Sequence, residues 1–345
     1  MCPLIKELEK RGCFDITVLA GGQHVEAVRS VVGEFGVKID TELSVSPIAG
    51  RLASVGASVL VGADNVIKEK KPDVVLVHGD TATAHAVALA AFYNRVPIGH
   101  VEAGLRTASV EEPFPEELFR RAISLMAAVH FAPTEHAAQN LISEGRQNVF
   151  ITGNTVLDAL SYTVSDSYTD PLCDKAGRHP TLLVTAHRRE SRGEGHREIF
   201  RAAAKISLAY PHIFVVLAAH PSPQVRESLS VLKNSRVTVC EPLGVRAFHN
   251  LLARSFAVLT DSGGVQEEAA ALGVPVLVCR GVTERSEGIA AGCAELVGVA
   301  CDRITDAFAT LVTDGGKYKK MAAAENPYGN GTASVKIADI LTKGW

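Results

Sequence analysis

The sequence predicts an α/β protein with two parallel sheets, each in a domain of its own. Short apolar, β-branched runs alternate with longer segments rich in Ala, Leu, Glu and Lys. The apolar runs are hydrophobic along nearly their whole length, as in parallel strands that helices cover on both faces. A length of 345 residues suits two domains of ordinary size. We therefore expect two Rossmann-like domains that face a cleft.

In the first half, the apolar runs predict five buried strands. They are residues 16–20, 73–79, 96–101, 130–134 and 148–152. The segments between them have helical composition, and they predict helices at 82–93, 115–127 and 136–144. This half opens on a helix-like segment, PLIKELEKRG, whereas a doubly wound domain normally opens on its central strand. We therefore expect the first strand of the N-terminal domain to be missing from the chain.

The second half repeats the pattern with five further strands. They are expected at 181–186, 213–219, 236–241, 256–260 and 275–280. Helices are expected at 195–209, 245–254 and 265–272. After a loop with the sequence NPYGNG, the last residues predict a terminal helix.

The polar segment 161–180 interrupts the alternation and contains two prolines, as linkers between domains do. The predicted organisation is an N-terminal domain at 1–165, a C-terminal domain at 175–327, and a terminal helix at 328–345. We expect that helix to pack on the N-terminal domain.

Composition excludes several function classes. With 35 Lys and Arg against 38 Asp and Glu, nothing favours nucleic acid or an anionic membrane as partner. No apolar stretch reaches the ~20 residues of a membrane span, and the N-terminus lacks the apolar centre of a signal peptide. The seven cysteines form no C-x-x-C pair and no zinc spacing. We expect reduced thiols, no metal, and a cytoplasmic protein.

Candidate site residues follow the predicted strands, because ligands bind beyond the carboxyl ends of strands in open α/β sheets. Asp80 ends the strand 73–79, and Glu102 and Arg106 follow the strand 96–101. Asp80 has an alternative explanation as the N-cap of the next helix. Glu116, in PFPEE, suits a first helical turn, where the helix dipole favours an acid.

Basic side chains follow two strands of the second half. His187 and two arginines come after the strand 181–186, and His220 holds the same place one strand later. An imidazole beside guanidinium groups is suited to phosphate. A single histidine at a strand end is otherwise a structural or merely exposed residue.

The segment TDSGGVQEEA is the sharpest local signal. Ser262, Gly263 and Gly264 stand between a strand and a helix, where the backbone can approach an anion and helix amides can bind it. Glu268, one helical turn further, is placed to reach ribose hydroxyl groups. A plain turn with capping acids is the alternative. The pattern is neither G-x-G-x-x-G nor a Walker A motif.

Taken together, HGDTATA, GHVEAGLRT, PFPEE, HFAPTE, ITGNTVLDAL, HRRES, TDSGGVQEEA, LGVPVLV, TERSEG and NPYGNG resemble the bacterial non-hydrolysing UDP-N-acetylglucosamine 2-epimerases. The resemblance covers nearly the whole chain in the right order. It implies the glycosyltransferase-B architecture, a homodimer, and interconversion of UDP-GlcNAc and UDP-ManNAc without cofactor or metal. The reaction it implies is anti elimination of UDP to 2-acetamidoglucal, followed by re-addition of UDP.

The resemblance also assigns roles to the candidate residues. Asp80, Glu102 and Glu116 would be the catalytic carboxylates, with their individual roles left open, and His187 would sit by the departing diphosphate. Substrate binding would fall to a further set: Arg106, His220, Ser262, Gly263, Gly264, Glu268 and Arg285.

The chain departs from the family at two places. The strand and the GTRPE-type loop that usually precede the first helix, with an Arg and a Lys for the substrate, have no counterpart. The usual Gln-His-Arg run of the regulatory site reads Gln23-His24-Val25, and a second Arg-Gln pair is replaced near residues 48–50. We expect reduced or absent activation by UDP-GlcNAc, because a lost guanidinium weakens phosphate binding.

Three other functions remain open at this point. A hydrolysing epimerase would release free ManNAc and UDP. A glycosyltransferase could share the architecture, although it has no evident need for the three carboxylates. A non-catalytic nucleotide-sugar binder would fit a chain without the phosphate loop.

Overall fold

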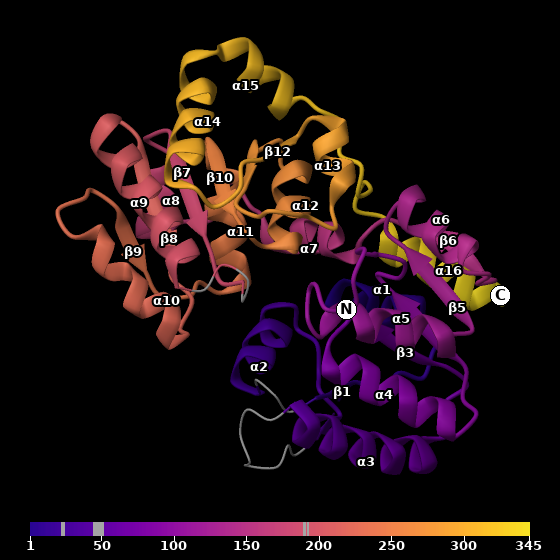
Figure 1. The fold of residues 1–345 in the computed structure, drawn as a ribbon. Helices are drawn as coiled ribbons and strands as arrows, with labels where there is room; N and C mark the ends of the chain where they lie inside the picture. Colours follow the sequence, from indigo (N-terminus) through magenta and orange to yellow (C-terminus); the bar gives the residue numbers. More distant parts are fainter. Residues whose placement is uncertain (22–24, 44–51, 189–190, 192) are drawn as a thin grey trace. The chain divides into compact units, whose positions relative to one another are not determined.

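The structure is a computed structural model, and it describes residues 1–21, 25–43, 52–188, 191 and 193–345. The chain forms two units (Figure 1). Unit 1 comprises Met1–Ala159 and Tyr328–Trp345, and unit 2 comprises Leu160–Pro327. Each unit contains a parallel sheet with helices packed on it, which confirms the predicted fold class. No helix in the described part of the chain combines the length and the hydrophobicity that a membrane span requires.

Unit 1 is built on a four-stranded sheet in the order β3-β4-β5-β6. Its strands are β3 (Val75–His78), β4 (Ile98–Val101), β5 (Val129–Ala132) and β6 (Val149–Ile151). All neighbours pair in parallel, so the carboxyl ends of the strands meet at one edge of the sheet. Separately, β1 (Leu19–Ala20) pairs in parallel with β2 (Thr41–Glu42).

Helices surround this sheet, and local signals explain where some of them begin. They are α1 (Cys2–Arg11), α2 (Val25–Glu34), α3 (Leu52–Lys70), α4 (Ala82–Tyr93), α5 (Glu116–Met126), α6 (Glu135–Ser143), α7 (Thr155–Thr163) and α16 (Ala333–Lys343). Helices α4 and α6 each start after a threonine, Thr81 or Thr134, whose hydroxyl accepts a backbone N–H of the first turn.

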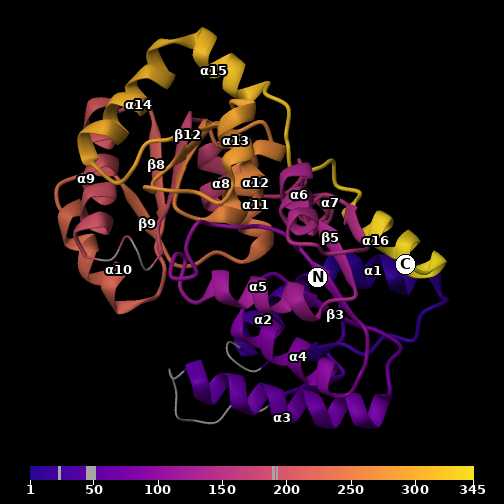
Figure 2. The same cartoon turned by 45° about the vertical axis from the view of Figure 1, so that its right-hand side comes forward.

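The first and last helices of the chain lie side by side in unit 1 (Figures 1 and 2). Nη1 of Arg11 in α1 lies 2.6 Å from Oδ1 of Asp339 in α16. Leu4 and Ile337 are fully buried, in one apolar cluster with Phe131 of β5. The C-terminal segment is therefore part of the fold of unit 1.

Unit 2 has a six-stranded parallel sheet in the order β12-β11-β10-β7-β8-β9. The strands are β7 (Thr181–Thr185), β8 (Phe214–Ala218), β9 (Thr238–Cys240), β10 (Ala257–Thr260), β11 (Val276–Val278) and β12 (Ala294–Leu296). Strand β7 is central, with β8 on one side and β10 on the other. The strand order thus reverses between β7 and β10, and this is where a doubly wound sheet binds its ligand.

The helical elements of unit 2 follow the strands, with α8 before the first of them. They are α8 (Pro171–Ala176), α9 (Glu194–Ala209), α10 (Pro223–Ser228), η2 (Leu229–Leu232), α11 (Val245–Ala253), α12 (Gly263–Ala271), α13 (Ser286–Ala291), α14 (Cys301–Thr313) and α15 (Gly315–Ala322). Cores on the two faces of the sheet are rich in Leu, Val, Ile and Ala.

The expected linker at 161–180 contains more structure than its polarity suggests. The division between the units falls inside α7, which is one continuous helix. Helix α8 follows within the same segment. Asp170 accepts the N–H groups of Leu172 and Cys173, and Pro171 occupies the first helical position. An Asp-Pro pair is a helix start, which polarity alone did not reveal.

Two buried histidines make the stability of unit 1 depend on pH. His100 and His130 are neighbours on β4 and β5, and each has an Nδ1 without a hydrogen-bond partner among the described residues. Burial lowers the pKa of His100 to about 3 and that of His130 to about 4. In the unfolded chain both titrate near pH 6.5. The unfolded state therefore binds more protons between about pH 6.5 and 4, and stability is lost as the pH falls through this range.

We expect each of these two histidines to lower the free energy of unfolding by about 2 kcal/mol between pH 7 and pH 5. Urea denaturation at the two pH values measures this change. His130→Gln should reduce the difference, while the matched variant of an exposed histidine, His179→Gln, should leave it unaltered. An equal pH dependence in the His130 variant and the unmodified protein would contradict the assignment.

Candidate active site

Asp80 and Glu102 lie at neighbouring strand ends of unit 1. Asp80 follows β3 and Gly79, and Glu102 is the first residue after β4. Thr81 caps α4, so the capping explanation for Asp80 is wrong. A Cβ atom on Gly79 would lie 3.1 Å from Oε2 of Glu102. Because Gly79 has no side chain, the Glu102 carboxylate can lie against it, next to Asp80.

Glu102 is held in an uncommon conformation by several contacts. Its φ angle is 61°, a left-handed value that costs a residue other than glycine about 1–3 kcal/mol. Asn154 donates to Oε1 of Glu102 over 3.1 Å, and the backbone N–H of Asn154 donates to the carbonyl of Tyr328. Nδ1 of His78 lies 3.8 Å from Oε2. Burial lowers the pKa of His78 to about 3, so the imidazole is neutral and forms no ion pair with Glu102 near pH 7.

The third carboxylate, Glu116, is the first residue of α5. One turn later on the same helix face, Arg120 donates from Nε to Oδ2 of Asp80 over 2.9 Å, and its Nη2 bonds the same oxygen. Because Arg120 on this helix face bonds Asp80, the start of α5 with Glu116 lies near Asp80. The structure brings the three carboxylates that we expected to be catalytic to the same end of the unit 1 sheet.

Arg106 makes its contacts elsewhere. Its Nε and Nη2 donate to the two carboxylate oxygens of Glu144 over 2.7 and 2.8 Å, and Nη2 also lies 3.2 Å from the hydroxyl of Ser124. This bidentate pair fastens the loop after β4 to the end of α6. The contact is structural, and a substrate-binding role for Arg106 stays a prediction.

His187 follows β7, and a buried aspartate holds its loop. Oδ2 of Asp261 accepts the backbone N–H groups of His187 and Arg188, both over 2.9 Å. Nδ1 of His187 lies 3.5 Å from Oδ1 of Asp261, which is fully buried. The ring of His220, after β8, stacks on that of His187 with the centroids 5.6 Å apart. The two histidines expected at separate strand ends therefore form one exposed pair at the centre of the sheet.

The glycine turn lies at the neighbouring strand end. Ser262 is the N-cap of α12, and Gly263 and Gly264 open the helix after β10. Since β7 and β10 are adjacent, this helix start lies at the switch point together with His187. The amide groups at the start of α12 and the positive end of its dipole favour an anion here.

Arg285 covers this turn from the next loop. A Cβ atom on Gly263 would lie 2.7 Å from Cζ of Arg285, so the guanidinium packs directly on the glycine. Nε of Arg285 donates to Glu267 over 2.8 Å, and Nη1 donates to Glu284 over 2.6 Å. Glu284 also accepts from Arg280 over 2.6 Å. Two buried carboxylates thus fix the position of a buried guanidinium beside the helix start.

Glu268, expected to bind ribose, is 8% exposed and has a histidine partner. Nε2 of His249 lies 3.4 Å from Oε1 of Glu268. Nδ1 of His249 lies 2.7 Å from the hydroxyl of Thr163. If Nε2 carries the proton, the hydroxyl donates to Nδ1, and this chain of contacts orients Glu268.

Two of the expected site residues, Gln23 and His24, lie outside the described residues, and so does the second departure expected near residues 48–50. In the described part of the chain, no group of three or more His, Cys, Asp and Glu side chains is arranged to hold a metal ion. Sequence reasoning missed the side chains that orient the expected ones: Asn154, Arg120, Glu117, Asp261, His249, Glu267 and Glu284.

The chain is similar over nearly its whole length to known proteins. The sequence profile described as UDP-N-acetylglucosamine 2-epimerase matches residues 6–342. A protein of Bacillus subtilis with that name is 45% identical over 345 residues, which cover 99% of this chain and 91% of the relative. A crystal structure of the UDP-GlcNAc 2-epimerase of Neisseria meningitidis, bound to UDP-GlcNAc, has a TM-score of 0.95 at 39% identity and covers 100% of this chain and 96% of that one.

A more distant structure extends the comparison at the level of the fold alone. The calicheamicin glycosyltransferase CalG4 has a TM-score of 0.60 at 18% identity, over 99% of this chain and 93% of that one. The architecture with two parallel sheets is therefore of the glycosyltransferase-B kind.

Proposed function

The chain belongs to the UDP-N-acetylglucosamine 2-epimerase family, and we propose that it converts UDP-GlcNAc reversibly to UDP-ManNAc by elimination and re-addition of UDP. The observation that carries this proposal is the group of three carboxylates at one end of the unit 1 sheet, where Asp80 and Glu102 follow neighbouring strands and Glu116 opens α5. A reaction that removes a proton from carbon and returns it to the opposite face of the sugar needs such groups.

In the proposed first step, the bond from C1 to the diphosphate oxygen breaks and its electron pair leaves with UDP. Positive charge develops at C1, which nearby carboxylates stabilise and which makes the hydrogen on C2 more acidic. A carboxylate takes that proton, and the former C–H electron pair becomes the C1=C2 double bond of 2-acetamidoglucal. In the reverse sense, a carboxylic acid protonates C2 from the other face and UDP re-forms its bond to C1.

Unit 2 would hold the nucleotide during both steps. The start of α12 with Ser262, Gly263 and Gly264 offers backbone amides for the diphosphate, and Arg285 offers a fixed positive charge. His187, with Nδ1 directed to Asp261, has Nε2 for the departing phosphate. Glu268, oriented by His249, is suited to the ribose hydroxyls.

The experiment that tests this function follows UDP-GlcNAc by NMR in D2O. We expect UDP-ManNAc to accumulate to equilibrium, with deuterium from the solvent at C2 of both sugars. Free ManNAc as the product would instead identify a hydrolysing epimerase. Binding of UDP without any turnover would identify a nucleotide-sugar binder.

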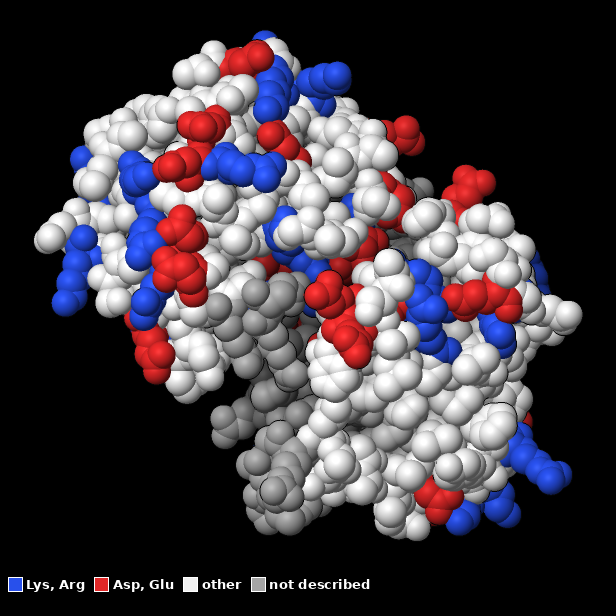
Figure 3. Space-filling model, viewed as in Figure 1, with Lys and Arg blue, Asp and Glu red and all other residues white. Residues whose placement is uncertain are grey.

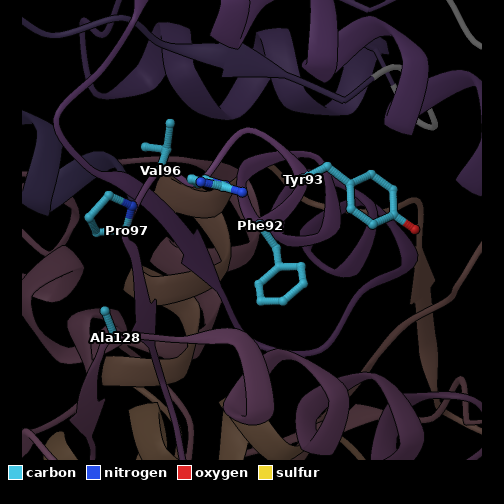
Figure 4. A pocket seen from close by; sticks show the side chains of 6 residues that line it. Phe92, Tyr93, Val96, Pro97 and Ala128 are labelled. Carbon is cyan, nitrogen blue, oxygen red and sulfur yellow. The ribbon is translucent and has the colours of Figure 1, made fainter.

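The homodimer that the resemblance implies has a candidate surface in unit 1. The face over α4 carries few charged side chains (Figure 3), and Phe92 and Tyr93 at the end of α4 are 54% and 65% exposed. They line a shallow hollow together with Arg95, Val96, Pro97 and Ala128 (Figure 4). The hollow adjoins Pro97, before β4, so it lies at the opposite end of the strand from Glu102. We propose that a second copy of the chain covers it.

We expect Tyr93→Glu to convert a dimer to a monomer, because a charge would be buried at the contact. Light scattering after size-exclusion chromatography measures the mass. Tyr162→Glu alters another exposed tyrosine, on α7, and should leave the dimer intact. A monomeric unmodified protein, or dissociation by both variants, would refute this surface.

A further inference from the structure

Helix α5 carries a buried charged pair that the proposed chemistry does not use directly. Glu117 is fully buried and Arg120 is 3% exposed. Nη1 of Arg120 donates to Oε2 of Glu117 over 2.7 Å. Charged side chains are seldom buried so completely, and they are retained only where their charges are matched by partners. The pair therefore calls for an explanation beyond the packing of α5.

The Glu117 carboxylate is held in place by two further hydrogen bonds besides that from Arg120. Its Oε1 accepts from Nε of Arg121 over 2.6 Å, and its Oε2 accepts the backbone N–H of Thr107 over 3.2 Å. Arg121 in turn donates to the carbonyl of Thr107 over 2.9 Å. These contacts fasten the first turns of α5 to the loop that follows β4 and Glu102. Glu117 is thus held from several directions and can serve as an anchor.

Arg120 extends from that anchor to Asp80. Two of its nitrogens, Nε and Nη2, donate to the same oxygen of Asp80, Oδ2, while Nη1 remains on Glu117. A planar guanidinium that is bonded on two sides has little freedom to rotate. The Asp80 carboxylate is consequently fixed through its oxygen Oδ2. Its other oxygen, Oδ1, has no hydrogen-bond partner among the described residues and is left for a ligand.

We propose that Arg120, anchored by Glu117, is the positioning residue for Asp80 in the reaction. The inference rests on the proposed catalytic role of Asp80. Arg120 does not touch the sugar in this account. It sets the direction of the Asp80 carboxylate, and a small rotation of that group would place its reactive oxygen away from C1 and C2.

A matched pair of variants separates positioning from structural support. Arg120 and Arg121 are adjacent on α5, and both bond the buried Glu117, but only Arg120 has a hydrogen bond to Asp80 in the described structure. Arg120→Met removes the donors and keeps most of the apolar length of the side chain. Arg121→Met removes a comparable charge from the same carboxylate.

We expect Arg120→Met to lower kcat about 100-fold, with KM for UDP-GlcNAc and Kd for UDP within threefold of the unmodified protein. Arg121→Met should lower kcat less than threefold. Arg120→Lys keeps the positive charge but lacks the planar set of N–H donors, so it should recover part of the lost kcat. This variant also tests the proposal if Arg120→Met does not fold. Thermal melts of all variants show which of them are folded.

Equal losses of kcat in the folded Arg120 and Arg121 variants would overturn the proposal, and so would a loss in the Arg120 variants that appears only in the affinity for UDP. Asp80→Asn, measured in parallel, distinguishes a failure of the proposed role of Asp80 from a failure of the positioning role of Arg120. If Asp80→Asn turns over normally, the proposed role of Asp80 fails. If Asp80→Asn is inactive while Arg120→Met and Arg120→Lys keep normal kcat, only the positioning proposal fails.

Discussion

Glu102→Gln is expected to lower kcat for epimerisation at least ~1000-fold, because the amide can neither accept the proton from C2 nor balance the positive charge at C1. The effect should be confined to the chemical step. Glu102 belongs to unit 1, whereas the residues proposed to hold the nucleotide belong to unit 2. Calorimetry should therefore give a Kd for UDP within about threefold of the unmodified value, with turnover followed by NMR on the same preparation.

The shape of the site supports the choice of an isosteric change. Gln keeps the size of Glu102 and can retain the contact with Asn154, so the left-handed backbone at this residue is not further disturbed. Glu111→Gln is the matched control, since it removes one negative charge from an exposed position of the same unit. Turnover at the unmodified rate in Glu102→Gln would remove this residue from the mechanism. A loss of UDP binding in the same variant would show that the effect is not confined to chemistry.

Most strands of the two sheets could be predicted, since they are nearly continuous apolar runs. The partly polar strands β2 and β12 were not expected, and the expected strand 16–20 is only the two-residue β1, outside the four-stranded sheet. The segments 181–186 and 256–260 enclose β7 and β10, and Asp80, Glu102 and Ser262 stand just past strand ends, as the predicted fold requires. In the expected linker 161–180, polarity misled because a strong local signal overrode it. Helix α8, inside the expected linker, begins because Asp170 and Pro171 form a helix start.

The side chains that orient the site could not be predicted in the same way, because their partners are distant in sequence. Arg120 reaches Asp80, and His249 reaches Thr163, only after the elements have packed. In the sequence alone, Glu117 and Arg120 look like an ordinary i, i+3 ion pair on an exposed helix face, and nothing indicates that both side chains are buried. The position of Asp261 directly after a strand was a better signal, but its partners include two backbone N–H groups, which no side-chain pattern reveals.

The glycine turn of unit 2 gives the second large expected effect. Gly263→Ala should weaken UDP binding about 30-fold, or about 2 kcal/mol. The new Cβ atom would lie 2.7 Å from Cζ, 2.8 Å from Nη1 and 3.0 Å from Nε of Arg285. The guanidinium cannot move aside easily, because Glu267 and Glu284 hold it in a buried position. Either Arg285 or the start of α12 must shift, and both are proposed to bind the diphosphate.

Gly264→Ala provides the comparison one residue away. A Cβ atom there would meet only Oε1 of Glu268, at 4.0 Å, which is ordinary contact. The same chemical change at the same helix start should therefore weaken UDP binding at most about fivefold, since no group has to move. Calorimetric titration of both variants with UDP measures the difference. Losses of equal size would mean that the turn tolerates no side chain at either glycine, and that the contact between Gly263 and Arg285 does not determine the affinity.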